Sequence, residues 1–331
     1  MDTNILVTAA EERVRTMTIH VNVDNFVRAE TDRMFADLQR NAGAVNTFAH
    51  NREPASVDNQ AVIRLNRDTL YSFAVVDLAE GATLTIPEHG DRYMSAMVVN
   101  QDHFVGAIFH DAGEYQLRPN DFNTRHVVVA VRTLVDPARP EDIGTVSALQ
   151  DQIALESGSA QPFTLPDYDT ASMDTTRTAL LTLAAGLTGF DSMFGRPDQV
   201  KPVHHLIGTA AGWGGLPSDE AAYIGVLPDT SGRNQEVTLR DVPVDGFWSI
   251  SVYNAEGFFE KNPQDSYSVN NITGTPNADG SVTVRFGDFP DGTPNAIPTT
   301  DGWNYLIRLY RPRTAVLDGT WQPPTLEPAQ N

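Results

Sequence analysis

The sequence predicts a mainly β protein in which two antiparallel β domains, of the sandwich or barrel kind, are joined by a helical segment. Two blocks of short strand-like runs, residues 61–135 and 236–310, favour this class because closely spaced turns leave no room for the helices of βαβ units. Between the blocks, apolar residues recur at helical spacing. We expect four parts: an N-terminal segment with an amphipathic helix (1–43), a first sandwich (44–140), a helical insert with a Gly-rich connector (141–217) and a second sandwich (218–331).

The first regular element is an amphipathic helix over residues 24–40. Charged residues separate apolar or neutral positions that fall at helical spacing: Val27, Thr31, Met34, Phe35 and Leu38. Asn41-Ala42-Gly43 should end this helix. A loop over 46–59 follows it and carries His50.

The first β block contains seven expected strands: 61–65, 69–78, 82–86, 92–100, 103–109, 114–118 and 126–135. Gly, Pro, Asn and Asp clusters separate them. The run 70–78 alternates between Tyr71, Phe73 and Val75 on one side and equally apolar residues on the other, so we expect both of its faces to be covered. The apolar run from His126 to Val131 should be a central strand.

Helices are expected over 141–155 and 175–187, the second capped by Asp174. The Gly-rich stretch 204–217 is interpreted as a connector, and 218–223 as a capped helical turn. Strands return over 236–241, 246–254, 266–270, 281–286 and 303–310. On the strand 246–254, Ser249, Ser251 and Tyr253 share one face, opposite the apolar Trp248 and Ile250.

The composition narrows the classes of partner and chemistry. A chain of 331 residues with a net charge of -20 is unsuited to nucleic acid or an anionic membrane surface. It has no cysteine, which excludes disulfides, thiol catalysis and iron–sulfur clusters. No apolar run approaches the roughly 18 residues of a membrane helix. The N-terminus has no basic segment before an apolar one, so we expect a cytoplasmic protein unless an export signal has been removed.

Several familiar catalytic motifs are missing from the sequence. It contains no G-x-S-x-G elbow, no G-x-x-x-x-G-K-[ST] loop and no H-E-x-x-H motif. The Gly-rich stretch 208–215 has no lysine and no βαβ frame, so it is interpreted as a tight turn.

The stretch from Leu65 to Ser72 places four polar residues directly before a buried strand. Asn66, Arg67, Asp68 and Thr69 need partners there, since buried polar groups without them are costly. Two interpretations stay open. Arg67 and Asp68 could form an ion pair that closes the strand end, or the four residues could form the floor of a pocket.

The chain has eight histidines, most of which we expect to be hydrogen-bonded to the backbone. His103 is our first choice for a metal-free general acid or base. Alternatively, His50, His103 and one of the pair His204 and His205, with His205 preferred, could hold a divalent metal together with a carboxylate.

Six stretches form a specific combination over nearly the whole chain: DNFVRAE (24–30), NRDTLYS (66–72), QDH (101–103), HLIGTAAGWGG (205–215), VPVDGFWSISVYN (242–254) and RLYRP (308–312). The combination resembles a bacterial family that pairs domain of unknown function 1254 with domain of unknown function 1214. The resemblance implies two jelly-roll-like β-sandwich domains with a helical insert. The family has no accepted catalytic residues to transfer. Ala296 replaces a residue that is larger in most of the family, which should leave that corner more open.

Two functions follow as hypotheses. The first is an enzyme, a hydrolase or lyase, acting on a small organic molecule, with anions among the candidates, in a cleft at the strand ends. Its catalytic residues would be His103, Asp68 and Tyr71, and its substrate-binding residues Asn66, Arg67, Thr69, Trp213, Tyr253 and Asn254. The second is a non-catalytic module that binds a ligand or carbohydrate or assembles into a homo-oligomer.

Overall fold

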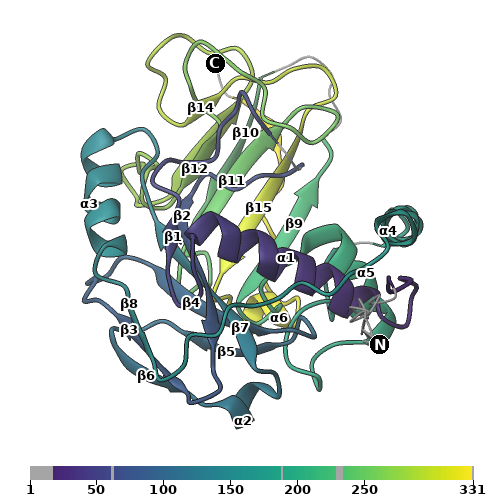
Figure 1. Cartoon of the computed structure of the whole chain (residues 1–331). Helices are drawn as coiled ribbons and strands as arrows, with labels where there is room; N and C mark the ends of the chain where they lie inside the picture. The colour runs from purple at the N-terminus through teal and green to yellow at the C-terminus, as the bar shows by residue number, and fades with distance from the viewer. Residues whose placement is uncertain (1–17, 61–62, 188, 229–233, 330–331) are drawn as a thin grey trace, which may run out of the picture.

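The structure, a computed structural model, describes residues 18–60, 63–187, 189–228 and 234–329. It confirms a mainly β protein with several antiparallel sheets and a few helices (Figure 1). The strand expected at 61–65 lies outside the described residues at 61–62, and residues 63–65 form a turn and irregular chain. Within the described ranges, every helix is too short or too polar to cross a membrane.

The first domain is a sandwich of a five-stranded and a three-stranded sheet. The larger sheet runs in the order β1 (Ala49–His50), β2 (Thr69–Asp77), β7 (His126–Leu134), β4 (Met94–Asn100) and β5 (Val105–Phe109). The smaller sheet runs in the order β6 (Gly113–Leu117), β3 (Ala82–Ile86) and β8 (Ala154–Ser157), with the short α2 (Pro119–Phe122) beside it.

Both faces of the larger sheet are covered, as the apolar alternation of β2 predicts. One face, including Ala74, Val76 and Val129, packs on the small sheet. The opposite face, including Val75 and Val128, packs against Phe35 of the N-terminal helix and against residues of the second domain. Because β8 pairs with β3, the first sandwich continues to Ser157, beyond the expected boundary at residue 140.

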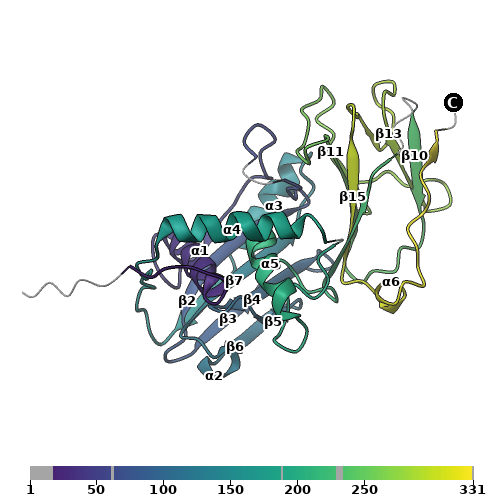
Figure 2. The same cartoon turned by 90° about the vertical axis from the view of Figure 1, so that its right-hand side faces the viewer.

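Three helices, α1 (Phe26–Ala42), α4 (Thr170–Ala184) and α5 (Pro202–Gly212), lie together against the first domain (Figure 2). A further helix, α3 (Pro140–Gln150), ends before β8 and is therefore shorter than the helix predicted over 141–155. The N-cap of α4 is Asp169, which accepts from the Ser172 backbone N–H, and not the predicted Asp174.

The stretch interpreted as a Gly-rich connector contains a helix, α5. Pro202 occupies its first turn, where a missing N–H has no consequence. Gly208 serves close packing, because a Cβ there would lie 2.7 Å from Cβ of Met193. The prediction of a Gly-rich connector was therefore wrong over 204–212.

The second domain is a sandwich of two four-stranded sheets around an apolar core (Figure 2). One sheet runs β14 (Ala296–Ile297), β13 (Val282–Phe286), β10 (Gln235–Leu239) and β16 (Glu327–Pro328). The other runs β12 (Ser268–Asn270), β11 (Trp248–Tyr253), β15 (Asn304–Tyr310) and β9 (Ala221–Val226), and α6 (Thr314–Leu317) follows it. The helical turn predicted at 218–223 is present only in its first part: the Ala221 N–H donates to the Pro217 carbonyl (2.9 Å), and residues from Ala221 onward pair with β15. The jelly-roll connection of the strands stays a prediction.

The sheet β12–β11–β15–β9 has one face on the core of the second sandwich, and its other face does not point to solvent either. Trp248, Ile250 and Ile307 point into the core of the second sandwich. The residues between them therefore point the other way, and Tyr310 packs in the same apolar cluster as Val75 and Val128 of the first domain. This contact makes the polar side chains of β11 and β15 part of an interface between the domains.

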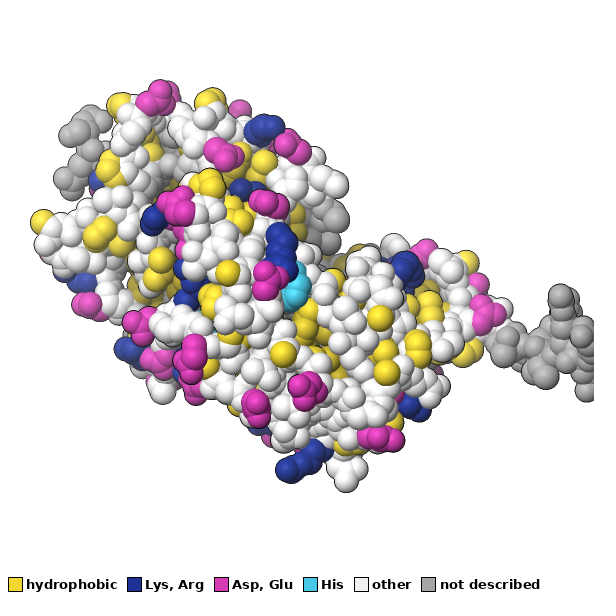
Figure 3. Space-filling model, turned by 60° about the vertical axis from the view of Figure 1, so that its left-hand side comes forward, with side chains coloured by type: hydrophobic (Ala, Val, Ile, Leu, Met, Phe, Trp, Pro, Cys, Tyr) yellow, Lys and Arg dark blue, Asp and Glu magenta, His cyan; other side chains and the backbone are white. Residues whose placement is uncertain are grey.

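The surface carries few basic groups, in keeping with the net charge of -20. On the face that Figure 3 shows, acidic side chains are scattered among arginines and small apolar areas, without a continuous basic surface.

Candidate functional site

A row of polar side chains crosses the interface side of the larger sheet in the first domain. Tyr71 on β2 is the cross-strand partner of Arg132 on β7, and Arg132 is the partner of Ser95 on β4. Paired residues of antiparallel strands point to the same face. The guanidinium carbon of Arg132 lies 5.4 Å from the centre of the Tyr71 ring.

A second row crosses the facing sheet of the second domain. Ser249 on β11 is the cross-strand partner of Asn270 on β12 and of Arg308 on β15, and Arg308 is the partner of Tyr223 on β9. The second row therefore brings its own buried arginine to the interface.

Hydrogen bonds join the two rows through the polar stretch before β2. The Asn66 amide donates to the hydroxyl oxygen of Tyr310 (3.0 Å) and, more weakly, to that of Tyr71 (3.4 Å). The Asn270 amide donates to Asp68 (3.2 Å). We use the name interdomain polar cluster for the polar residues of the two rows and of the stretch that lies between them: Asn66, Asp68, Tyr71, Arg132, Tyr223, Arg308 and Tyr310.

Arg132 is the most unusual member of this cluster. It is 8% exposed, yet among the described residues its only hydrogen bond goes to the carbonyl oxygen of Gly214 (2.7 Å). No carboxylate of the described chain pairs with it, and one terminal nitrogen of its guanidinium has no partner. A buried charge in this state is costly unless something else balances it.

Other atoms near the cluster also have no hydrogen-bond partner within the described chain, among them Oδ2 of Asp68 and the Oγ atoms of Ser95 and Ser249. Arg308 is 2% exposed and Asp68 is fully buried. Counting Arg132 and Arg308 against Asp68, the cluster has an excess of one positive charge. Such sites usually hold ordered water or a ligand that supplies the missing partners.

The tyrosines of the cluster differ in their acidity. Burial raises the pKa of Tyr223 and of Tyr310. Burial acts on Tyr71 in the same direction, but the Arg132 charge and the hydrogen bonds of its phenol lower the pKa of Tyr71 below its ordinary value. A tyrosine shifted in this direction is suited to giving up a proton.

The cluster reaches an open cleft at Tyr223. This cleft, of about 920 Å³, lies between segment 189–199, β9 and α6. Its lining includes Phe190, whose ring meets that of Tyr223 edge to face with centroids 5.9 Å apart. Tyr71 and Tyr223 both keep part of their surface accessible, although each lies within a strand. Tyr223 is the member of the cluster that lines this cleft, whose wall combines apolar side chains such as Phe190 with polar ones such as Ser192.

The predicted ion pair between Arg67 and Asp68 does not form. Arg67 donates to the carbonyl oxygen of Ala55 and lies over the ring of Tyr267 at 5.2 Å. Asp68 points into the interface instead, toward Asn270. Neighbouring residues of an extended chain point to opposite sides, so only one of them can enter the cluster.

His103 lies behind the cluster with both ring nitrogens engaged. The Thr209 hydroxyl donates to the carbonyl of His205, so it accepts from Nδ1 of His103 (2.8 Å). The Gly214 N–H donates to Nε2 of His103 (2.9 Å). Burial, together with the neighbouring His205 ring, lowers the pKa of His103 well below its ordinary value. His103 is therefore neutral, and it holds the N–H of the same residue, Gly214, whose carbonyl accepts from Arg132.

The three histidines expected as metal ligands are not assembled. Both ring nitrogens of His205 face backbone carbonyls, those of Met193 and Asp102. His50 lies on β1 and bonds the Ser72 hydroxyl (2.8 Å). In the described part of the chain, no group of three or more His, Asp or Glu side chains is arranged to hold a metal ion.

The remaining predicted residues divide between the cluster and its surroundings. Thr69 accepts from Asn66, and the Tyr253 hydroxyl accepts from Arg308 (2.7 Å), so both border the cluster. The indole of Trp213 stacks on His103 at 5.3 Å. Asn254 lies apart, where its side chain accepts from the backbone of Phe258 in a turn.

Sequence reasoning did not identify Arg132 and Tyr223 as site residues. Arg132 lies in an otherwise apolar strand, His126–Leu134. A single arginine in a run predicted to be central and covered on both faces is the signal that could have found it, because such a charge needs a partner. Tyr223 carried no such signal.

The fold and this interface define a two-sandwich protein with a polar site between its domains. Two family models match the chain, each described as a protein of unknown function: DUF1254 over residues 45–157 and DUF1214 over residues 228–314. The chain thus belongs to the family in which these two domains are paired. No curated protein matches it.

Two solved structures are similar to this chain. The VPA0106 protein from Vibrio parahaemolyticus has a TM-score of 0.69 and 17% sequence identity, over 94% of this chain and 100% of that one. A putative uncharacterized protein from Burkholderia cenocepacia has a TM-score of 0.49 and 14% identity, over 92% and 86% of the two chains. The first likeness extends along nearly the whole of this chain and supports the two-domain fold.

Proposed function

We propose that this protein is an enzyme for a small organic anion, which enters by the cleft at Tyr223 and places its negative group against Arg132. The observation that carries the proposal is the buried Arg132, which has no carboxylate partner in the described chain and a guanidinium nitrogen without a hydrogen bond. A carboxylate would balance the charge and accept from this nitrogen.

Tyr71 is the group we assign to proton transfer. It lies against Arg132, and its pKa is lowered by that charge and by hydrogen bonds of its phenol, against the effect of burial. A proton moved at the bound molecule by a phenol beside a fixed cation is chemistry that hydrolases and lyases both use. Asn66 would orient the phenol, since its amide lies 3.4 Å from the Tyr71 oxygen.

The other residues predicted as catalytic take supporting roles in this proposal. Asp68 holds the second domain in place through Asn270, and its free oxygen faces the same interface. His103 positions Gly214 by accepting from its N–H, and Arg132 donates its one hydrogen bond within the described chain to the carbonyl of the same residue. Arg67 and Asn254 lie outside the site.

The test is carboxylate binding to the wild type and to Arg132→Met. Acetate, butyrate, benzoate and phenylacetate are titrated at constant ionic strength, by calorimetry and thermal shift. At least one should bind the wild type and raise its melting temperature. Hydrogen bonds to a charged group contribute about 1.5–3 kcal/mol, so Arg132→Met should bind that probe roughly 10- to 150-fold more weakly.

Arg118→Met is the matched control, because Arg118 is exposed and its substitution changes the net charge by the same amount. It should bind the probe as the wild type does. Arg132→Met should also fold, since it removes an uncompensated buried charge. Equal binding by Arg132→Met and the wild type, or no binding of any probe to the wild type, would contradict the proposal.

A further inference from the structure

A second cavity, of about 710 Å³, lies beside the edge strands β12 and β14 of the second domain and has no part in the site described above. The first domain contributes Arg67 and the segment 136–138 to its wall. The second domain contributes the rest, from segments 263–275 and 287–299. The volume lies within the range of small-molecule sites, and junctions between domains are common places for them.

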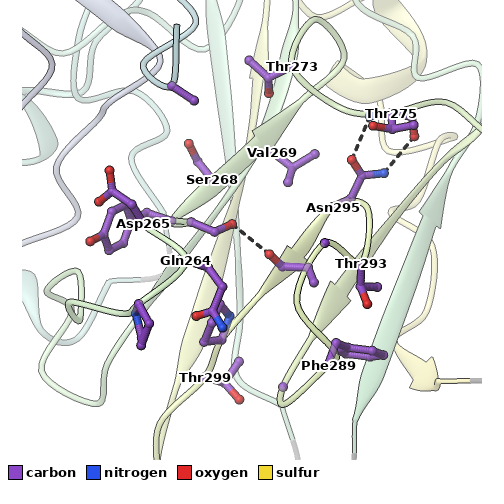
Figure 4. Close-up of a pocket in the computed structure, with 18 of the residues that line it drawn as sticks. Gln264, Asp265, Ser268, Val269, Thr273, Thr275, Phe289, Thr293, Asn295 and Thr299 are labelled. Atoms are coloured by element: carbon purple, nitrogen blue, oxygen red, sulfur yellow. Dashed lines mark hydrogen bonds between the residues drawn. The ribbon is translucent and has the colours of Figure 1, made fainter.

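Polar side chains from both segments point into this cavity (Figure 4). Some of them stabilise the walls: Asn295 accepts from the Thr275 N–H and donates to the Thr275 carbonyl (both 2.8 Å). Others make no side-chain hydrogen bond within the described chain. These unengaged groups are the hydroxyls of Ser268, Thr275 and Thr299 and the carboxylates of Asp265 and Asp288.

Two aromatic rings lie among these polar groups. Phe289 is half-buried in the wall formed by segment 287–299. Tyr267 is 4% exposed, and its hydroxyl has no hydrogen-bond partner in the described residues. Burial and the nearby Asp265 carboxylate raise the pKa of Tyr267, so the phenol stays protonated and can donate. An unpartnered, nearly buried hydroxyl in a cavity wall indicates that a ligand or water completes it.

The charges in the cavity wall argue against an anionic ligand. Asp136, Asp265 and Asp288 oppose the single cation Arg67, so an organic anion would be repelled. A metal ion is not favoured either, because no group of three suitable side chains comes together in the described chain. What remains in number is neutral: hydroxyls and amides beside the ring of Phe289.

We propose that this cavity binds a neutral saccharide. Carboxylates and a guanidinium are planar groups that accept from, and donate to, pairs of neighbouring sugar hydroxyls. The Phe289 ring would cover the apolar C–H face of the sugar, as aromatic rings do at amphipathic ligands. Arg67, which lies over the Tyr267 ring, would donate from the part of its guanidinium that does not bond to Ala55.

The test uses glucose, galactose, maltose and cellobiose as probes, with the full chain and calorimetric or NMR detection. At least one should bind the wild type with saturation. Phe289→Ala removes the ring face and should weaken binding about three- to tenfold. Asp265→Asn removes a charged acceptor and should weaken sugar binding by about tenfold or more. Asp265 is exposed and has a left-handed backbone, a conformation that asparagine also tolerates, so the variant should fold.

Phe258→Ala and Asp301→Asn are matched controls, because these residues lie in the same domain but not in the wall. They should bind the sugar as the wild type does, and so should Arg132→Met, which separates this proposal from the anion site. Saturable binding of tetramethylammonium instead of any sugar would overturn the proposal in favour of a cation site. Absence of saturation with all four sugars, or unchanged binding in Phe289→Ala and Asp265→Asn, would also overturn it.

Discussion

Tyr71 and Arg132 form the pair on which the proposed chemistry depends, and the pair makes anion binding sensitive to pH. Above its pKa, the Tyr71 phenolate supplies the negative charge that Arg132 lacks and so competes with a carboxylate. Carboxylate binding should therefore weaken as the pH rises. Because the pKa of Tyr71 is lowered, the weakening should begin below the ionisation of free tyrosine, which occurs at about pH 10.

Calorimetric titrations of the carboxylate probe across about pH 7 to 10 check this prediction. Tyr71→Phe should remove the pH dependence and, since it deletes one neutral hydrogen-bonding group worth about 1 kcal/mol, change binding roughly fivefold or less near pH 7. A pH dependence that is the same in Tyr71→Phe and the wild type would show that another group is responsible.

The candidate site could be predicted from the sequence only on one side. The polar stretch 65–72 pointed to the interface, and Asn66, Asp68, Thr69 and Tyr71 do meet there. Their partners Arg132 and Arg308 come from strands 60 or more residues away. Which strands face each other is a property of the tertiary packing, and local periodicity does not contain it.

Among the elements, the segment before β11 closely approaches the end of β15. The Gly246 N–H donates to the Tyr310 carbonyl (3.1 Å), and a Cβ at Gly246 would lie 2.8 Å from that same oxygen. Gly246→Ala should therefore push the two segments apart and lower the free energy of unfolding by about 1–3 kcal/mol. Denaturant unfolding monitored by circular dichroism measures the change.

Gly225→Ala is the matched control for this substitution. Gly225 lies in the exposed part of β9 and a Cβ there would meet nothing within 4 Å, so its stability should change by about 0.5 kcal/mol or less, or rise slightly. If both substitutions had the same effect, the close approach would not be the cause of the loss.

Element prediction succeeded where one face of an element is apolar and failed where packing overrides composition. The strands of both sandwiches and the helix at 26–42 follow their alternation or helical spacing. The helix α5 was not predicted, because its glycines were interpreted as helix breakers, whereas they allow close contact with Met193 and Phe194. Strand β9 escaped because it is an edge strand whose pairing with β15 decides its conformation.

At the scale of the whole molecule, Arg308 ties the two sandwiches together. Its guanidinium donates to the carbonyls of Arg64 (2.9 Å) and Leu65 (3.1 Å) in the first domain, and to Ser251 and Tyr253 in the second. Arg308→Met should leave each apolar core intact but weaken the interface. We expect calorimetric unfolding to change from one transition in the wild type to two in this variant.

Arg240→Met provides the comparison for this experiment, because Arg240 forms an exposed ion pair with Asp279 inside the second domain. It should keep the single transition, since an exposed ion pair contributes little. Should Arg308→Met also unfold in one transition with an unchanged midpoint, the two sandwiches would be coupled by their apolar contacts alone.

Gly214 links the proposed site to a tryptophan, which gives binding at the site an optical signal. Its N–H is held by His103 and its carbonyl by Arg132, and the neighbouring indole of Trp213 stacks on the same histidine ring. Trp248 and Trp303 lie in the core of the second sandwich, with Trp321 packed against it. An anion that draws the guanidinium away from Gly214 would thus disturb the surroundings of one tryptophan and spare the other three. The chain carries its own fluorophore at the place where occupancy is to be read, so that emission can follow binding without any attached dye.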